Sequence, residues 1–420
     1  MAERKRGLGI DVLTAARERI SRIFDDFPRI YVSFSGGKDS TVMLHLVMEE
    51  AIKRGRRDIG VLFIDLEGQY KLTIDHVAAC YERYRDWIEP HWVALPIHLR
   101  NGVSVHETHW LCWDPDQPER WIRPDGPPAY AITDEAYYPF FVRGMEFEEF
   151  TPAFGHWFAQ DQPCACFVGI RTDESLNRWR TIAGGRKQML DDHPWTTWCG
   201  DGLYNAYPLY DWRTEDLWTY HARYPELPYN RLYDRMYQAG LTIHQARICQ
   251  PYGDDQRKGL WLFHIIEPET WARIVARVDG VNGGALYARE SGSINGVRGI
   301  QKPPNHTWQS FAELLLESMP PKTADHYRDK IAVFIRWWQQ RDFEYGENYS
   351  QGIPDELPAR LESGADGPGS RRPSWRRICK MLLRNDYWAK GLSFSQTKSE
   401  TWERYKKIMK RRRAAWGIYG

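Results

Sequence analysis

Residues 30–47 read IYVSFSGGKDSTVMLHLV, and this stretch decides the fold. Its apolar, β-branched beginning at 30–34 predicts a strand, and its end at 41–47 predicts a helix. Two adjacent glycines let the backbone between them take positive φ and turn its N–H groups toward an anion, while the helix points its positive end at the same place. The stretch therefore predicts a turn that binds pyrophosphate, formed by Ser35, Gly36, Gly37, Lys38, Asp39 and Ser40.

The turn is not a Walker A loop, because Lys38 is followed by Asp39 rather than by Ser or Thr. The hexapeptide instead resembles the PP-loop of the ATP pyrophosphatases, enzymes that cleave ATP between the α and β phosphates and form an adenylylated intermediate. This resemblance implies that residues 35–40 hold the leaving pyrophosphate. The alternative, a turn that is merely rich in Gly and Ser, is disfavoured by the strand and helix signals on either side.

The composition is that of a soluble enzyme rather than of a disordered or membrane protein. The chain has 420 residues, of which 42% are hydrophobic and 27% charged, and its formal net charge is +1. This length predicts roughly two or three domains, each able to bury a core. No stretch approaches ~18 uninterrupted apolar residues, and residues 1–6 are not followed by the apolar segment of a signal peptide. We therefore expect a cytoplasmic protein without a membrane partner.

Residues from about 10 to 265 alternate strand and helix signals, which predicts an α/β fold with a parallel sheet. The apolar run 60–65 ends in Asp65, and buried parallel strands deliver functional side chains at their carboxyl ends. Asp65 is therefore a candidate nucleotide contact, with a helix N-cap as the alternative. A further strand is predicted at 166–170. The Pro- and Trp-rich insertion at about 110–130 is expected to be a surface excursion or a lid.

Two later motifs extend the resemblance. Gly169-Ile170-Arg171 is followed by Asp173-Glu174-Ser175 and Arg178, and residues 207–218 read YPLYDWRTEDLW. Together with the turn, these motifs resemble the phosphoadenosine phosphosulfate (PAPS) reductase and sulfate adenylyltransferase small-subunit family. The resemblance implies a Rossmann-like, adenine nucleotide alpha hydrolase-like domain over residues 1–265. It also implies ATP as the nucleotide, with Gly169 and Asp65 joining the turn in the binding site.

Residues 65–70, DLEGQY, depart from the Asp-Thr-Gly that the sulfate adenylyltransferase small subunits usually carry there, so the substrate is expected to differ. This segment, the 111–114 patch and the helical region that follows resemble the subgroup that includes the immunoglobulin-binding regulator A proteins of bacteria and phages. The resemblance further implies a ParB-like or sulfiredoxin-like protein partner.

The candidate catalytic residues follow from charge. Attack on the α-phosphorus of ATP builds negative charge on phosphate oxygens and on pyrophosphate, so the site needs cations and backbone donors. Lys38 is the first candidate cation, and Arg171 and Arg178 are the next, because a guanidinium can hold two oxygens at once. Mg²⁺ is expected on the triphosphate, with Asp39 as its direct or water-mediated partner. For Arg171 the alternative is a structural ion pair with one of the acidic residues that follow it.

Four of the seven cysteines, Cys164, Cys166, Cys199 and Cys249, could ligate zinc or an iron-sulfur cluster. Their spacing lacks the repeated C-x₂-C of most zinc sites, so ordinary buried thiols are the alternative. The PAPS reductases use a redox-active cysteine in a mobile C-terminal tail, and no cysteine follows Cys379 in this sequence. Reductase activity is therefore not expected.

The sequence changes character after about residue 265. Helical periodicity at 269–278, 308–319 and 323–341 predicts a helical accessory domain over 266–351, followed by a Pro- and Gly-rich linker at 352–374. The last segment, 375–420, interleaves basic and aromatic residues, a mixture that could bind nucleic acid. The alternative is a solvated helix end that docks on the α/β domain or on a partner protein.

The sequence as a whole predicts an enzyme that binds ATP and Mg²⁺, cleaves ATP to AMP and pyrophosphate, and adenylylates an acceptor in sulfur or nucleic-acid modification chemistry. One alternative is a nucleotide-dependent regulatory protein that acts through a partner protein or DNA. A further alternative is a PAPS-using reductase or sulfotransferase, for which Arg171 and Arg178 would bind the 3′-phosphate.

Overall fold

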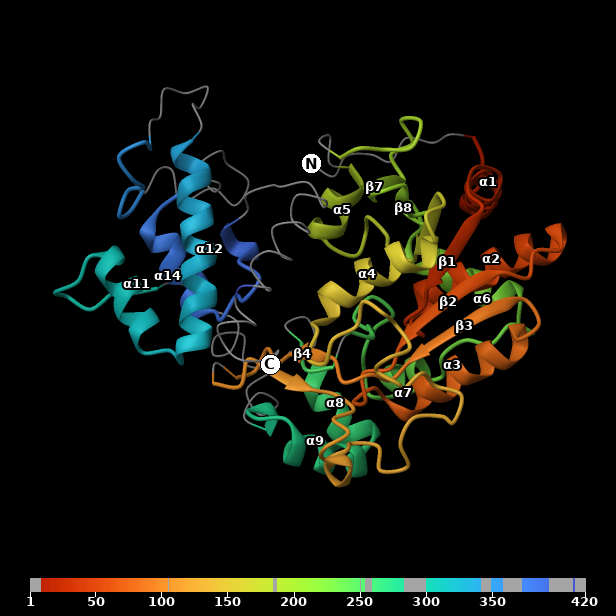
Figure 1. Cartoon of the computed structure of the whole chain (residues 1–420), viewed down its shortest axis with the longest axis horizontal. Coiled ribbons are helices and arrows are strands. Elements are labelled where there is room, and N and C mark those ends of the chain that lie inside the picture. Colours follow the sequence, from red (N-terminus) through yellow and green to blue (C-terminus); the bar gives the residue numbers. More distant parts are fainter. Residues whose placement is uncertain are drawn as a thin grey trace.

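The protein is described by a computed structural model that covers residues 9–104, 106–183, 187–249, 251–253, 259–282, 300–340, 349–357, 372–392 and 411. Figure 1 shows an α/β region that contains the labelled strands and, beside it, a group of helices from the end of the chain. The α/β fold and the helical C-terminal region predicted from the sequence are both confirmed.

A six-stranded sheet forms the centre of the α/β region. Its strands run in the order β3-β2-β1-β6-β8-β7, and all neighbours are parallel except β7, which is antiparallel to β8. Every residue of β2 is buried, as expected for a parallel strand covered on both faces. The strands are β1 (Arg29–Ser33), β2 (Ile59–Ile64), β3 (Ile88–Val93), β6 (Cys164–Val168), β7 (Thr196–Gly200) and β8 (Leu203–Ala206).

Helices cover both faces of this sheet. One hydrophobic core joins the sheet to α1 (Val12–Asp26), α2 (Lys38–Arg54), α3 (Lys71–Tyr84) and α6 (Thr214–Arg223). The opposite face is covered by α4 (Phe147–Ala159). In α4, Phe150, Phe154 and Phe158 recur every fourth residue and are at most 1% exposed, which is the stripe of an amphipathic helix. Two of these rings, Phe154 and Phe158, lie edge-on to Tyr31 of β1, with centroids 5.3 and 5.4 Å away.

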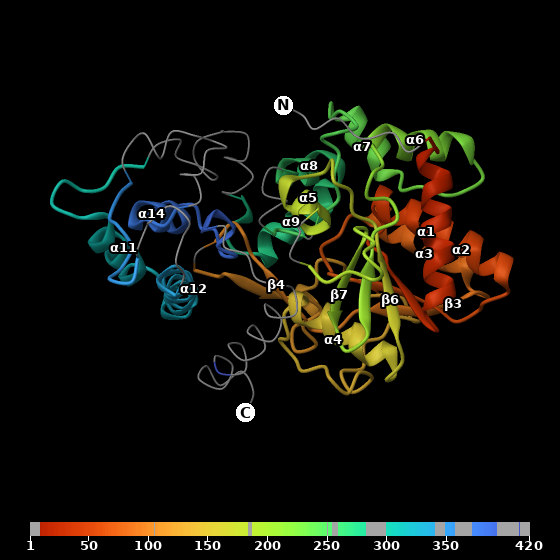
Figure 2. The same ribbon diagram turned by 90° about the horizontal axis from the view of Figure 1, so that it is seen from above.

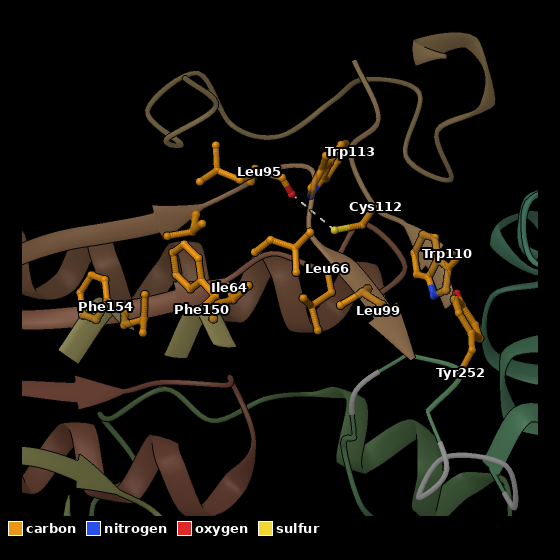
Figure 3. Close-up of a cluster of buried hydrophobic side chains, with 14 of the residues drawn as sticks. Ile64, Leu66, Leu95, Leu99, Trp110, Cys112, Trp113, Phe150, Phe154 and Tyr252 are labelled. Atoms are coloured by element: carbon orange, nitrogen blue, oxygen red, sulfur yellow. Dashed lines mark hydrogen bonds between the residues drawn. The ribbon is translucent and has the colours of Figure 1, made fainter. Parts of the chain in front are cut away.

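The insertion near residues 110–130 packs against this second core. A small antiparallel pair, β4 (His98–Arg100) and β5 (His109–Leu111), leads into it, and it contains the short helix η1 (Pro118–Arg120). Figure 3 shows Trp110, Cys112 and Trp113 among the buried side chains, with the Cys112 thiol 3.5 Å from the Leu95 carbonyl oxygen. Trp113 is 3% exposed and Ile122 is 2% exposed. The prediction of a surface excursion or lid is therefore wrong for this part of the insertion, because Trp110, Trp113 and Ile122 are core side chains.

The chain continues through α5 (Leu176–Ala183) and α7 (Leu232–Gln238) to α8 (Leu260–Ile266) and α9 (Pro268–Arg277). Phe263 of α8 and Ile274 of α9 are fully buried in the same core as α4. The predicted domain boundary at residue 265 stays a prediction; it falls within the last turn of α8, and α8 and α9 share the core of the α/β region.

The C-terminal helices have a core of their own. It joins α11 (Trp308–Glu317), α12 (Pro321–Gln339), α14 (Trp375–Leu383) and η4 (Lys390–Leu392), with Phe334, Ile378 and Leu392 fully buried. Figure 2 places α12 and α14 on the same side of the molecule as β4. Most of the predicted linker and of the predicted basic segment lies at 358–371, 393–410 and 412–420, outside the described residues. No helix among the described residues is both long enough and apolar enough to span a bilayer.

Candidate functional site

The predicted phosphate-binding turn lies where the order of the sheet reverses. From β1 the chain builds β2 and then β3 on one side, and β6 later pairs with the other side of β1. In open α/β sheets this reversal leaves a crevice at the carboxyl ends of the strands, where ligands bind. The turn joins the end of β1 at Ser33 to the start of α2 at Lys38, so it forms the floor of that crevice.

The turn has the geometry of an anion site. Gly36 has a φ of +71°, and a Cβ built there would lie 2.8 Å from Val77 Cγ2, so both conformation and space require glycine. Gly37 is the N-cap of α2. The hydroxyl oxygens of Ser35 and Ser40 lie 3.0 Å apart and close the turn across its mouth. The amino end of α2 therefore faces the turn with its positive dipole end.

Gly169 shapes this turn from the neighbouring strand. A Cβ at Gly169 would lie 2.8 Å from the Ser40 backbone nitrogen and 2.9 Å from the Asp39 carbonyl carbon. The end of β6 thus touches the first turn of α2, and only glycine allows this approach. Gly169 was predicted as a nucleotide contact, and the structure brings it against the backbone of the phosphate-binding turn.

A segment far along the chain covers the turn. Asn230 Nδ2 donates to the Gly36 carbonyl oxygen at 2.9 Å, and the Lys38 backbone N–H donates to the Tyr233 hydroxyl at 3.0 Å. The Lys38 side chain is buried, and its Nζ donates to the Ala246 carbonyl oxygen at 3.2 Å. Burial raises the pKa of Tyr233, which stays protonated. The Tyr233 oxygen therefore accepts from the Lys38 backbone N–H at the start of the helix, where the sequence predicts a phosphate oxygen.

These residues were missed by sequence reasoning. The stretch 228–235 reads PYNRLYDR and contains no recognisable phosphate-binding pattern. Its role follows only from where α7 packs, which a local pattern does not encode. We name Asn230, Tyr233 and Ala246 the closing contacts of the turn.

Asp39 and Arg171 form a buried ion pair. Arg171 is 2% exposed and Asp39 is 8% exposed, and Arg171 Nε donates to Asp39 Oδ1. The second carboxylate oxygen, Oδ2, lies 3.5 Å from Lys38 Nζ. The structural pair that we considered for Arg171 therefore exists with another partner, Asp39. The guanidinium is further placed by the Trp212 carbonyl oxygen, 3.4 Å from Nη1.

Arg178 behaves differently from Arg171. Its Nε lies 2.9 Å from Glu174 Oε2, and its side chain is 45% exposed. The same Glu174 carboxylate accepts from the Arg171 backbone N–H at 3.3 Å. Arg178 thus has a guanidinium that can reach solvent and ligand, whereas the Arg171 guanidinium is enclosed.

Asp65 is buried in a polar contact network. Its carboxylate accepts from Trp92 Nε1 at 2.9 Å and from the Glu67 backbone N–H at 3.1 Å, and it forms an ion pair with Arg123. The N-cap of the following helix, α3, is Tyr70, so the alternative of an N-cap role is wrong. The carboxylate that was expected to contact nucleotide holds the Trp-rich insertion through Arg123.

A cavity of about 380 Å³ opens beside the phosphate-binding turn. Apolar side chains from β2, from α4 and from Phe34 after β1 line part of it, and the other lining residues include Ser35, Gln69, Arg100, Arg178, Cys249 and Trp388. Three of the predicted site residues, Ser35, Arg178 and Cys249, therefore line this cavity together. Its size is that of a small-molecule site, for which volumes of roughly 300–1,000 Å³ are usual.

The four cysteines considered as metal ligands do not form one group. Cys164 and Cys166 are buried on β6, Cys199 lies on β7, and Cys249 lines the cavity. Burial raises the pKa of Cys164 to about 12 and raises the pKa of Cys166 further, so both are protonated thiols. In the part of the chain that the structure describes, no three His, Cys, Asp or Glu side chains are placed to bind a metal ion.

Comparison with protein families gives two matches. A family model described as phosphoadenosine phosphosulfate reductase domain matches residues 29–95 and 158–239, which contain the turn, β6 and the closing contacts Asn230 and Tyr233. A second, described as "Domain of unknown function (DUF3440)", matches residues 240–357. The first match supports a nucleotide-binding domain of the PP-loop type.

Known proteins similar to this chain include two that carry no assigned function. "Uncharacterized protein YbdN" of Escherichia coli strain K12 is 47% identical over 414 residues, which cover 98% of this chain and 97% of that protein. "Uncharacterized protein MJ0066" of Methanocaldococcus jannaschii is 27% identical over 208 residues, covering 49% of this chain and 34% of that protein. Among solved structures, PAPS reductase from Candida auris, in a phosphate complex, is 16% identical with a TM-score of 0.30, covering 52% of this chain and 83% of that one.

Proposed function

Because this chain belongs to the family of the Escherichia coli protein YbdN and carries a phosphoadenosine phosphosulfate reductase domain, we propose that it is an ATP-cleaving adenylyltransferase. ATP binds with its β and γ phosphates at residues 35–40. An oxygen of the acceptor attacks the α-phosphorus, the bond from that phosphorus to the bridging oxygen breaks, and pyrophosphate leaves. The observation that carries this proposal is the phosphate-binding turn at the reversal point of the sheet, with the buried Lys38 at the start of its helix.

The cations are assigned from their positions. Lys38 is the charge that balances the leaving pyrophosphate, because it starts the helix on which the turn is built. Arg178 faces the cavity with a half-exposed guanidinium and is proposed to follow the oxygens of the α-phosphate during attack. Arg171 is enclosed with Asp39 and is proposed to act by fixing the first turn of α2. No covalent enzyme intermediate is required for this chemistry.

Magnesium enters this proposal as part of the substrate, MgATP. The Asp39 carboxylate does not fit direct coordination of Mg²⁺ as it is arranged, because one oxygen pairs with Arg171 and the other faces Lys38 Nζ at 3.5 Å. Two cations beside the carboxylate would oppose a third. We therefore derive no step through a protein-bound metal ion.

Several finer assignments stay proposals. The subgroup of the immunoglobulin-binding regulator A proteins and a ParB-like or sulfiredoxin-like partner rest on the sequence resemblance, whereas nucleic-acid binding by residues 375–420 and a cytoplasmic location rest on the composition of the sequence. Within the described part of that segment, Arg411 pairs with Asp329 at 2.9 Å. The chemical class that we propose for the acceptor is an oxyanion or a nucleic-acid group, as in sulfur and nucleic-acid modification.

The test separates binding from turnover. The purified protein is incubated with ATP and Mg²⁺, with no addition, with inorganic sulfate, or with total tRNA, and AMP, ADP and pyrophosphate are resolved by chromatography. Lys38→Ala is expected to abolish AMP and pyrophosphate formation. Lys53→Ala is the matched control, because Lys53 lies at the other end of α2 with its side chain 71% exposed. Formation of ADP, or nucleotide binding without turnover, would contradict adenylyl transfer and favour the regulatory alternative.

A further inference from the structure

One wall of the cavity comes from a part of the chain that neither family match covers. Trp388 follows α14 in sequence and is partly exposed, and it lines the same cavity as Ser35 of the phosphate-binding turn. The two family matches end at residues 239 and 357. The C-terminal helical region therefore reaches the nucleotide cavity with an aromatic side chain.

The neighbouring Tyr387 fixes the position of this indole. The Tyr387 ring stacks on His326 of α12, with centroids 3.6 Å apart and an angle of 6° between the rings. His326 Nε2 also lies 2.6 Å from the Tyr387 carbonyl oxygen. Arg100, which also lines the cavity, places its guanidinium carbon 4.3 Å from the centroid of the same Tyr387 ring. Tyr387, the residue before Trp388, therefore contacts both the C-terminal helices, through His326, and the α/β region, through Arg100.

A second contact joins the two regions close to this point. Asn385 Nδ2 donates to the Ser104 carbonyl oxygen at 3.4 Å, and Asn385 Oδ1 accepts from the Tyr327 hydroxyl at 2.8 Å. His109 of β5 lies edge-on to Tyr387, with ring centroids 5.1 Å apart. The C-terminal region is therefore attached to the insertion beside the cavity by polar and aromatic contacts.

We propose that the indole of Trp388 is a wall against which the purine base of the bound nucleotide stacks. The inference rests on the proposed function, since it takes the phosphates to be held at the turn. A nucleotide anchored there places its base in the rest of the cavity, whose lining includes the aromatic side chains of Phe34, Phe63, Phe147 and Trp388. Stacking on an aromatic face accepts either purine, so the wall contributes affinity without choosing between adenine and guanine. The C-terminal region thereby becomes part of the nucleotide site.

The test compares ligands with and without a base. Dissociation constants of Mg-ATP, Mg-GTP and Mg-pyrophosphate are measured by calorimetry for the full-length protein and for Trp388→Ala, Trp388→Phe and Trp179→Ala. Loss of one stacked base is expected to weaken ATP and GTP binding by about tenfold or more in Trp388→Ala. Pyrophosphate should bind unchanged, because it has no base, and Trp388→Phe should retain most of the affinity. Trp179→Ala removes an indole that is 44% exposed on α5 and should change nothing.

The outcomes distinguish failure of the proposed function from failure of the stacking inference. If the unaltered protein binds neither ATP nor pyrophosphate, the proposed function fails and the wall has no ligand. If it binds ATP and Trp388→Ala binds ATP equally well, the proposed function stands and the inference is overturned. If Trp388→Ala weakens ATP and pyrophosphate alike, the substitution has disturbed the turn, and base stacking is likewise overturned.

Discussion

Replacing Arg171 by methionine should increase local opening at the start of α2. Arg171 is 2% exposed, and among the described residues its loss leaves the Asp39 carboxylate, 8% exposed, with Lys38 Nζ at 3.5 Å as its remaining cation. Breaking a buried ion pair by removing one partner costs about 3–5 kcal/mol, since a charge remains buried. Because about 1.4 kcal/mol is a factor of ten, the lower value corresponds to roughly a 150-fold rise in local opening.

Hydrogen exchange measured by mass spectrometry on peptides from residues 29–54 would follow this opening directly. The neutral partner variant Asp39→Asn and the double variant complete a thermodynamic cycle. The double variant should exchange more slowly than the sum of the single effects implies, because both substitutions remove the same Arg171–Asp39 pair and neither of its charges is left without the other. Strictly additive effects, or exchange as slow as in the unaltered protein, would refute the reasoning.

Arg178→Met provides the control for this cycle. Arg178 pairs with Glu174 at 2.9 Å, but its side chain is 45% exposed, so solvent screens the pair and its loss should change exchange little. Arg178→Met and Arg171→Met also separate the roles proposed for the two arginines. Arg178→Met should reduce turnover and leave hydrogen exchange in α2 unchanged. Arg171→Met should reduce nucleotide binding and at the same time speed hydrogen exchange in α2.

Three further predictions follow from the contacts of the turn and of the core. Gly169→Ala should lower the free energy of unfolding by about 1–3 kcal/mol and weaken ATP binding, because its Cβ would lie 2.8 Å from the backbone of α2. Gly259→Ala, whose Cβ would have its nearest neighbour at 3.9 Å, is the control in calorimetry, and equal ATP affinities of the two variants would contradict the contact. Tyr233→Phe frees the amide at the start of α2 and should tighten pyrophosphate binding by up to about tenfold, whereas weaker binding would show that the hydroxyl serves the ligand. Burial lowers the pKa of His45 and of His221 from 6.5 to about 4, so as the pH falls the unfolded chain binds protons at these two residues before the folded chain does. The stability that the two neutral imidazoles contribute is therefore present above pH 6.5 and is lost as the pH falls toward 4, and a melting temperature that did not change between these values would contradict this prediction.

The strand, turn and helix at residues 29–54 could be predicted because their determinants are local. A β-branched apolar run, two adjacent glycines and a helix-forming run each act within a few residues, so the sequence pattern and the fold agree. The same holds for the parallel sheet, since alternating strand and helix signals admit few arrangements. The residue types of the anion site could thus be named before its surroundings were known.

The partners of these residues could not be predicted, because they arrive from distant segments. Tyr233 reaches the Lys38 amide from α7, and Trp388 reaches the cavity from the C-terminal region. Their positions depend on how whole helices pack, and neither sits in a motif. The insertion shows the opposite error, in which a Pro- and Trp-rich composition typical of loops was interpreted as surface although Trp113 is 3% exposed.

The turn after β2 explains why the sequence departs from the sulfate adenylyltransferase pattern at this point. Glu67, at a φ of +60° and fully buried, accepts from the backbone N–H groups of Trp113 at 2.6 Å and Ile122 at 2.8 Å. Arg277 of α9 lies 3.6 Å from the same carboxylate, and a Cβ at Gly68 would lie 2.5 Å from the Tyr252 hydroxyl oxygen. A residue at 67 that is too short, or that has no side-chain acceptor, would leave two buried amides without their acceptor. The departure therefore reflects the attachment of the insertion and of α9 to the sheet, and a change of substrate does not follow from it alone.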